Sequence, residues 1–181
     1  MSEQQSPTKI ICDRLAIGWQ TGFDLSVTIT PIAASGDIER NWNGKYVDLS
    51  EPEFRLFSVR ITSGDAEMRA PALARLWPGT VFTIVPSTPF EDMIPVGGTT
   101  VVFERLIHPG SVRCLDLEFN DVPFTVVGRT VTLSSPAATP VRVSARYELE
   151  VIVTEPWSIT DQETKASVSW SLGTEEVGGI I

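Results

Sequence analysis

Residues 141–154 alternate between apolar and polar side chains almost without a break. Val141, Val143, Ala145, Tyr147, Leu149, Val151 and Val153 occupy one set of positions, and Ile152 is the only apolar residue in the other set. Successive side chains of a β-strand leave on opposite faces, so this period of two predicts a strand. At about 3.3 Å per residue it would be more than twice as long as a typical strand.

Shorter segments with the same alternation follow one another along the chain. They predict strands at 9–15, 25–30, 38–49, 55–62, 81–85, 100–107, 112–119, 124–133 and 165–172. Asn43-Gly44 predicts a type I′ hairpin turn inside 38–49. Residues 66–76 are the one candidate for a short helix, which Pro71 interrupts. The pattern predicts an all-β fold, an antiparallel sandwich or barrel of about nine or ten strands, with a long C-terminal β-ribbon and flexible termini.

We expect a single all-β domain over residues 1–181. Within it, residues 1–8 are predicted to be a flexible N-terminal arm, 86–99 an irregular loop and 173–181 a C-terminal arm. Residues 155–164, which contain Trp157 and Ile159, are predicted to form a second loop.

Composition restricts the partners more than the fold. The formal net charge of −9 repels a phosphate backbone, so we expect no direct grip on nucleic acid. No apolar run reaches the eighteen or more residues of a membrane-spanning helix, and we expect no membrane partner. The start of the chain does not resemble a signal peptide. Cys12 and Cys114 lie in apolar stretches and are predicted to be free thiols, which fits a reducing compartment.

Residues that would support catalysis are scarce. His108 is the only histidine, and His108-Pro109-Gly110 is typical of a turn. The sequence has no nucleophile elbow, no cluster with metal-ligand spacing and no phosphate-binding loop. We therefore expect a protein that is not an enzyme and that needs no cofactor or metal.

Surface residues suit contacts with other proteins better. Trp157 and Ile159 are candidates for exposed contacts, and Phe90 lies in the predicted loop 86–99. The polar positions of the long strand form a further candidate interaction surface, made of Arg142, Arg146, Glu148 and Glu150. Trp170 lies on the apolar face of its strand and is predicted to be core, and Trp77 is predicted to be a packed corner.

Short sequence motifs in three regions of the chain follow one another in a characteristic order. They are RNWNG, VDLS and FR at 40–55, then APAL and WPG at 70–79, and finally SVSWSL and EEV at 167–177. This order resembles a family of small, uncharacterised virion-associated proteins of tailed phages and prophages. The resemblance covers roughly 25–85 and 141–177. Ser63 stands where that family carries a cysteine, and a longer insert at about 100–135 departs from it.

The resemblance implies a structural subunit of a virion, assembled in the host cytoplasm and associated with the tail as a tube, tube-end or baseplate component. Its partners would be copies of itself and other virion proteins. Two alternatives stay open. One is a capsid decoration or head-tail connector subunit. The other is a carbohydrate-binding module at the tail tip, with Trp157 and the 86–99 loop facing a host glycan.

Overall fold

The protein is all-β, as the alternation predicts. The computed structural model describes residues 10–18, 21–22, 24–32, 38–48, 55–64 and 67–178. Strands account for 51% of the structure and helix for 4%, and the sheets are antiparallel. The helical residues form short 3₁₀ turns, such as η3 (Leu73–Arg75) and η4 (Pro109–Ser111). The predicted N-terminal arm at residues 1–8 lies outside the described residues.

The chain forms two compact units, and one is inserted in the sequence of the other. Val85–Leu149 belong to the first, called here the inserted unit, and the described residues Ile10 and Ile11 are grouped with it. Cys12–Ile84 and Glu150–Ile181 form the second, called here the sheet unit. The single-domain expectation for residues 1–181 stays a prediction.

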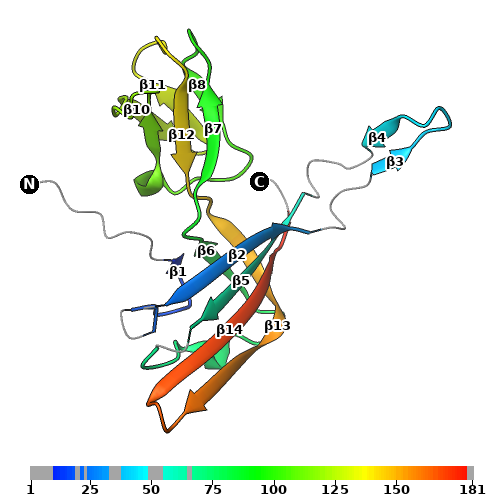
Figure 1. Ribbon diagram of the computed structural model, residues 1–181, viewed down its shortest axis with the longest axis vertical. Helices are drawn as coiled ribbons and strands as arrows, with labels where there is room; N and C mark the ends of the chain where they lie inside the picture. Colours follow the sequence, from blue (N-terminus) through cyan, green and yellow to red (C-terminus); the bar gives the residue numbers. More distant parts are fainter. Residues whose placement is uncertain are drawn as a thin grey trace, which may run out of the picture. The chain divides into compact units, whose positions relative to one another are not determined.

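The sheet unit is built on one six-stranded sheet, which curls into a half-barrel (Figure 1). Its strand order is β1-β6-β13-β14-β5-β2. The bounds are β1 Ile11–Cys12, β2 Leu25–Pro31, β5 Phe57–Ser63, β6 Val81–Val85, β13 Leu149–Gln162 and β14 Ser167–Glu176. β13 and β14 form a long C-terminal ribbon, but its first strand runs from Leu149 to Gln162 rather than over the predicted residues 141–154.

The core of the sheet unit lies on one face of this sheet. Val59 and Ile61 of β5 are fully buried, and Leu172 of β14 pairs with Ile61 and is buried as well. Trp170 is also buried, as predicted, and its Nε1 donates to the carbonyl of Thr21 at 3.3 Å. Burial of such apolar side chains is the main source of stability of the sheet.

The inserted unit contains two three-stranded sheets. One has the order β10-β11-β8 and the other β7-β12-β9. The bounds are β7 Phe90–Ile94, β8 Thr100–Val102, β9 Arg113–Leu115, β10 Phe124–Val127, β11 Thr130–Leu133 and β12 Val141–Ala145. Val141, Val143 and Ala145 of the central strand β12 are buried, so the alternation of this segment gives the unit its core.

A separate hairpin, β3 (Ile38–Arg40) and β4 (Tyr46–Asp48), confirms the turn predicted at Asn43-Gly44 but corrects its type. The amide of Gly44 donates to the carbonyl of Asn41 at 2.8 Å, and Gly44 has a φ of 74°. Asn43 is not in the left-handed region, which a type I′ turn would require. The loop is a turn closed by a left-handed glycine, with Trp42 and Asn43 at its tip.

The predicted strand at 141–154 is two strands. β12 ends at Ala145 and β13 begins at Leu149, and the two belong to different sheets. Between them the chain stays extended, and Tyr147 forms an isolated bridge with Ile107. The alternation continues across the break because extended backbone keeps its period of two whether or not it belongs to a sheet.

Several other local predictions are corrected. The predicted loop 86–99 contains β7, and the predicted loop 155–164 is largely the second half of β13. Residues 173–176, assigned to a C-terminal arm, belong to β14. Residues 124–133 are the hairpin β10–β11, with Gly128 at a φ of 59° in its turn. Trp77 is 67% exposed rather than packed.

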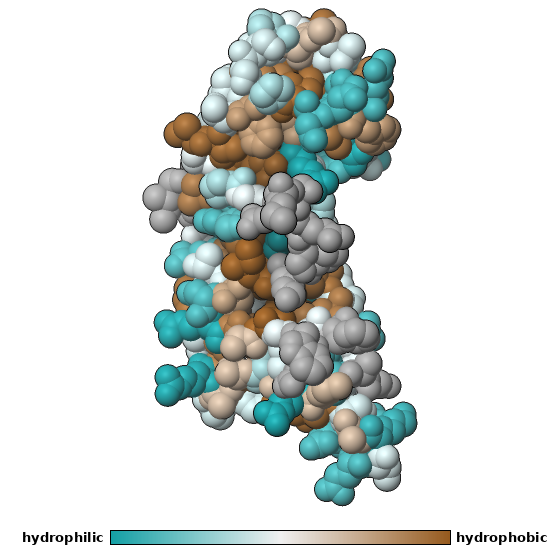
Figure 2. Space-filling model, turned by 90° about the vertical axis from the view of Figure 1, so that its left-hand side faces the viewer, coloured by the Kyte–Doolittle hydropathy of each residue, from teal (hydrophilic) through white to brown (hydrophobic). Residues whose placement is uncertain are grey.

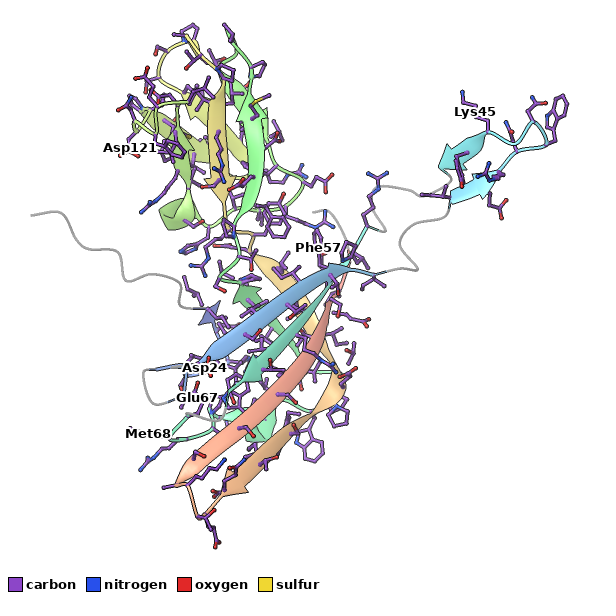
Figure 3. All side chains as sticks on the ribbon, in the orientation of Figure 1. Asp24, Lys45, Phe57, Glu67, Met68 and Asp121 are labelled. Atoms are coloured by element: carbon purple, nitrogen blue, oxygen red, sulfur yellow. The ribbon has the colours of Figure 1, made fainter. Side chains whose placement is uncertain are left out.

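A buried carboxyl group anchors the start of β2. Glu67 is fully buried, and its Oε1 accepts a hydrogen bond from the amide of Asp24 at 2.8 Å. The amide of Gly64 donates to the carbonyl of Asp24 at 2.7 Å. A Cβ on Gly64 would lie 1.8 Å from Asp24 Oδ2, so a larger residue here would displace the Asp24 side chain. Figure 3 labels Asp24 and Glu67, which lie next to each other at this end of the sheet.

We predict that Glu67→Leu lowers the free energy of unfolding by about 1–3 kcal/mol, because it removes the acceptor of the Asp24 amide. Glu67→Gln keeps a side-chain oxygen the same number of bonds from the backbone, so its free energy of unfolding should fall less. Urea unfolding of both variants measures the difference. Equal stability of Glu67→Leu and the wild-type protein would contradict this account.

A second prediction concerns Tyr147, whose ring stacks on Phe90 with centroids 4.1 Å apart. Burial, with a smaller contribution from the Glu104 carboxylate, raises the pKa of Tyr147 to about 12. An unfolded tyrosine ionises near pH 10. The stability contributed by the neutral phenol is therefore complete below about pH 10 and is lost between about pH 10 and 12.

Absorbance at 295 nm should show a tyrosine ionising near pH 12 in the wild-type protein. Tyr147→Phe keeps the ring that packs on Phe90 and should remove that transition. If the transition persists in Tyr147→Phe, Tyr147 is not its source.

Candidate interaction surface

The seven candidate contact residues do not form one surface. Phe90, Arg142, Arg146 and Glu148 lie in the inserted unit, and Glu150, Trp157 and Ile159 lie in the sheet unit. The division follows from the break between β12 and β13, which assigns the two halves of the predicted strand to different sheets.

Arg146 connects the two ends of the inserted unit. Its Nε donates to the carbonyl of Pro86 at 2.6 Å, and its Nη2 donates to the carbonyl of Val85 at 2.8 Å. The side chain is partly buried, and burial lowers its pKa. The guanidinium group therefore binds backbone carbonyls of the inserted unit itself, where the chain enters and leaves that unit.

The other candidates of the inserted unit also have partners within it. Arg142 of β12 forms an exposed ion pair with Glu91 of β7, which raises the pKa of the arginine. Glu148 Oε1 lies 3.0 Å from Nδ1 of His108. Phe90 is half-buried under Tyr147. Arg142 is the most accessible of these residues.

His108 has a serine nearby, but the geometry of that serine is structural. Ser111 Oγ donates to the carbonyl of His108 at 2.6 Å and accepts from the amide of Arg146 at 2.9 Å. The hydroxyl therefore holds the η4 turn against residue 146, and its proton is directed at the backbone of His108 rather than at the imidazole. A serine nucleophile would need its proton directed at the ring nitrogen.

The thiols and carboxylates show no arrangement for metal chemistry in the described ranges. No group of three or more His, Cys, Asp or Glu residues could hold a metal ion among those residues. Cys114 is free, and burial raises its pKa to about 11. Cys12 is free and only half-buried, and burial raises its pKa as well. A raised pKa keeps a thiol protonated and unreactive near neutral pH. No described helix is long and apolar enough to cross a membrane.

A pocket of about 370 Å³ lies in the sheet unit, between the start of the chain and η3. Arg14 and Arg75 line it together with alanine and leucine side chains. Asp13 also lines it, and Asp13 Oδ1 accepts a hydrogen bond from the amide of Thr83 at 3.2 Å. That contact fixes the carboxylate to β6.

The ribbon β13–β14 carries the candidates that remain open to other molecules. Ile159 is 44% exposed, and Trp157 is half-buried. Ile159 pairs with the buried Trp170 and so lies on the core face, whereas Ser158 pairs with Ser171 on the outer face. The hydroxyls of these two serines are 2.7 Å apart.

An ion pair crosses the ribbon on its outer face. Glu155 of β13 pairs with Gly173 of β14, which pairs with Arg60 of β5. Arg60 forms a salt bridge with Glu155 across this glycine. A Cβ on Gly173 would lie 2.9 Å from Glu155 Oε2, so the absent side chain leaves room for the contact. The register shifts on both sides of Glu155 mark the same place.

The hairpin β3–β4 is also exposed, and none of the seven contact candidates lies on it. Trp42 is 94% exposed, Ile38 64% and Tyr46 61%. Arg40 lies over the ring of Tyr46, 3.9 Å from its centroid. The signal was present in the sequence, because a tryptophan at a hairpin tip has no neighbouring strand to cover it.

Apolar side chains also reach the surface elsewhere. Figure 2 shows brown patches between hydrophilic ones on the face that it displays. Large apolar residues with exposed side chains include Met68, Trp77, Val81, Met93, Leu117, Phe119 and Val127. Scattered apolar exposure is ordinary, so exposure alone does not identify a binding surface.

The chain was compared with protein families and with curated proteins. No protein-family model matches the chain, and no curated protein matches its sequence.

Proposed function

We propose that this protein is a non-enzymatic structural subunit of a tailed-phage virion, associated with the tail, which joins its neighbours through the ribbon β13–β14 and the hairpin β3–β4. The observation that carries the proposal is the hairpin. Trp42, Tyr46 and Ile38 expose most of their surface on an element of two strands. A two-stranded hairpin alone is marginally stable in water.

The residue types on the hairpin support a role in docking. Tryptophan, tyrosine and arginine dominate the binding energy of protein interfaces. Trp42, Tyr46 and Arg40 lie within one turn and its two flanking strands, and the contact between Arg40 and Tyr46 orients both side chains. A neighbouring protein that covers them would stabilise the hairpin and bury an aromatic anchor.

The resemblance to phage virion proteins also supports a role as a virion subunit. The described parts of its recurring segments lie on the hairpin, just before β5, at η3 and the turn before β6, and on β14. All of them belong to the sheet unit, as does the departure at Ser63, whereas the longer insert at about 100–135 falls within the inserted unit. The sheet unit would be the common framework and the inserted unit the part specific to this chain.

We predict that an antibody against the protein labels the tails of purified particles of the phage that encodes it. Immuno-electron microscopy measures the position of the label. Label on the head would replace the tail assignment with the capsid alternative. Absence of the protein from purified particles, tested by mass spectrometry, would overturn the virion proposal.

We further predict that Trp42→Ser reduces incorporation into particles at least about tenfold, since a hot-spot side chain contributes about 2 kcal/mol or more. The free energy of unfolding of the free variant, measured by thermal unfolding, should stay within about 0.5 kcal/mol of the wild-type value, because the side chain is exposed. Trp77→Ser is the control, as Trp77 is an exposed tryptophan outside the hairpin. Equal incorporation of Trp42→Ser and the wild-type protein would show that the hairpin does not dock.

A further inference from the structure

The six-stranded sheet has an unpaired edge along β2. β2 is the last strand of the sheet and pairs only with β5 among the described residues, over its whole length from Leu25 to Pro31. The backbone groups on its other side therefore have no strand beside them within the described ranges. Natural proteins protect such edges with charged side chains, proline, bulges or covering segments. Leu25–Pro31 contains no charged residue and no register shift, and its one protecting feature is Pro31 at its last position.

A second unpaired edge lies along the far half of β13. The backbone near Val153 is bonded to the segment before β6, through the amide of Gly79 and the carbonyl of Thr80. Beyond it, residues 155–161 pair with β14 on one side, and no described residue is bonded to their backbone on the other. We call residues 155–161 the distal edge.

We propose that β2 of one copy of this chain pairs with the distal edge of a second copy as an antiparallel strand, so that the sheet continues from copy to copy. This inference rests on the proposed function and specifies how copies of the subunit meet.

The strand directions fit this pairing. β13 is antiparallel to β14, β14 to β5 and β5 to β2. β2 therefore runs opposite to β13. A second copy placed beyond β2 in the same orientation brings its β13 alongside β2 in the antiparallel sense, which is the more stable form of pairing.

The faces of the two edges also match. On the core face, β2 presents Leu25, Val27 and Ile29, which are only half-buried. The distal edge presents Ile159 on its own core face, with Trp157 two residues earlier. On the outer face, β2 presents Ser26, Thr28 and Thr30, and the distal edge presents Ser158 and Thr160. Pairing would place hydroxyls beside hydroxyls on the outer face and Ile159 beside apolar side chains of β2 on the core face, where Asp161 is the one charged residue of the distal edge.

Charge favours a second copy at this place. The chain carries a net charge of −9, so two copies repel each other over most of their surfaces. β2 has no charge, and Glu155 is paired with Arg60 inside its own copy. The junction leaves Asp161 as the one carboxylate of the two paired edges without such a partner among the described residues. This is a surface where copies can approach with little repulsion.

The contact is heterologous, since β2 and residues 155–161 are different surfaces. Each copy then offers one edge of each kind, and repetition gives a closed ring or an open filament. One short strand pair falls below the roughly 1,200 Å² that a stable interface buries. We therefore expect the pairing to operate within a ring or tube, where each copy makes two such contacts.

Cysteine cross-linking tests the pairing in a Cys12→Ser background. Thr28→Cys and Thr160→Cys are made separately, and the assembled proteins are treated with a short bismaleimide. A mixture of the two variants should give covalent dimers, at least tenfold more than either variant alone. Dimers from Thr28→Cys alone would indicate β2 against β2 and would overturn the proposal. Assembled protein without mixed dimers would overturn it as well.

A charge on the edge gives an independent test. Thr28→Lys should reduce the assembled fraction at least tenfold in light scattering and sedimentation, because it places a charged side chain beside the pairing strand. Thr125→Lys is the matched control, since Thr125 is an exposed strand threonine of the inserted unit. Circular dichroism of each monomer checks the fold.

The outcomes separate this inference from the proposed function. If Thr28→Lys folds, assembles and enters particles as the wild-type protein does, the edge pairing is wrong and the virion role stands. If the wild-type protein is absent from particles, the virion role is wrong, and cross-linking of the purified protein alone decides whether the edges pair.

Discussion

The antiparallel pairing of β13 with β14 is the constraint on which the sheet unit depends. β14 also pairs with β5, and β13 lies beside β6, so this ribbon joins both halves of the curled sheet. Its register sets Trp170 and Leu172 toward the core and Ser158 and Ser171 outward. A shift of one residue would reverse both faces, and the buried side chains of β5 would lose their neighbours.

The same ribbon explains why an inserted unit is tolerated. The chain leaves the sheet unit after β6 and returns at the start of β13, which are neighbouring strands. Arg146 binds the carbonyls of Val85 and Pro86 and so holds the outgoing and returning segments together inside the inserted unit. A unit whose two ends are adjacent can be placed between two paired strands without changing their register.

The sequence predicts a strand well where one alternating segment forms one strand of one sheet. It fails where a single alternating segment contributes strands to two different sheets. β6 matches its predicted range and β2 extends one residue beyond it, because turn residues bound both segments and apolar and polar residues alternate in β2. The alternation at 141–154 cannot reveal that β12 and β13 belong to different sheets, since sheet membership depends on distant partners. The predicted loop 155–164 contains Pro156, yet this segment is strand, because a strand edge without a partner tolerates proline. The contact candidates were divided for the same reason, and Arg146 finds its acceptors sixty residues away.

A sheet edge with no described partner and no protection other than the terminal Pro31 is a liability in a free protein, and its presence here requires a physical reason. β2 could be protected by one lysine on its outer face, where Ser26, Thr28 and Thr30 stand and where no buried neighbour would be disturbed. The rest of the surface carries strong net charge, which already opposes indiscriminate association. An acidic surface with neutral edges restricts contact to those edges, where backbone hydrogen bonds fix the geometry. Such a distribution suits a protein that must stay soluble as a monomer and join its partners in one defined way.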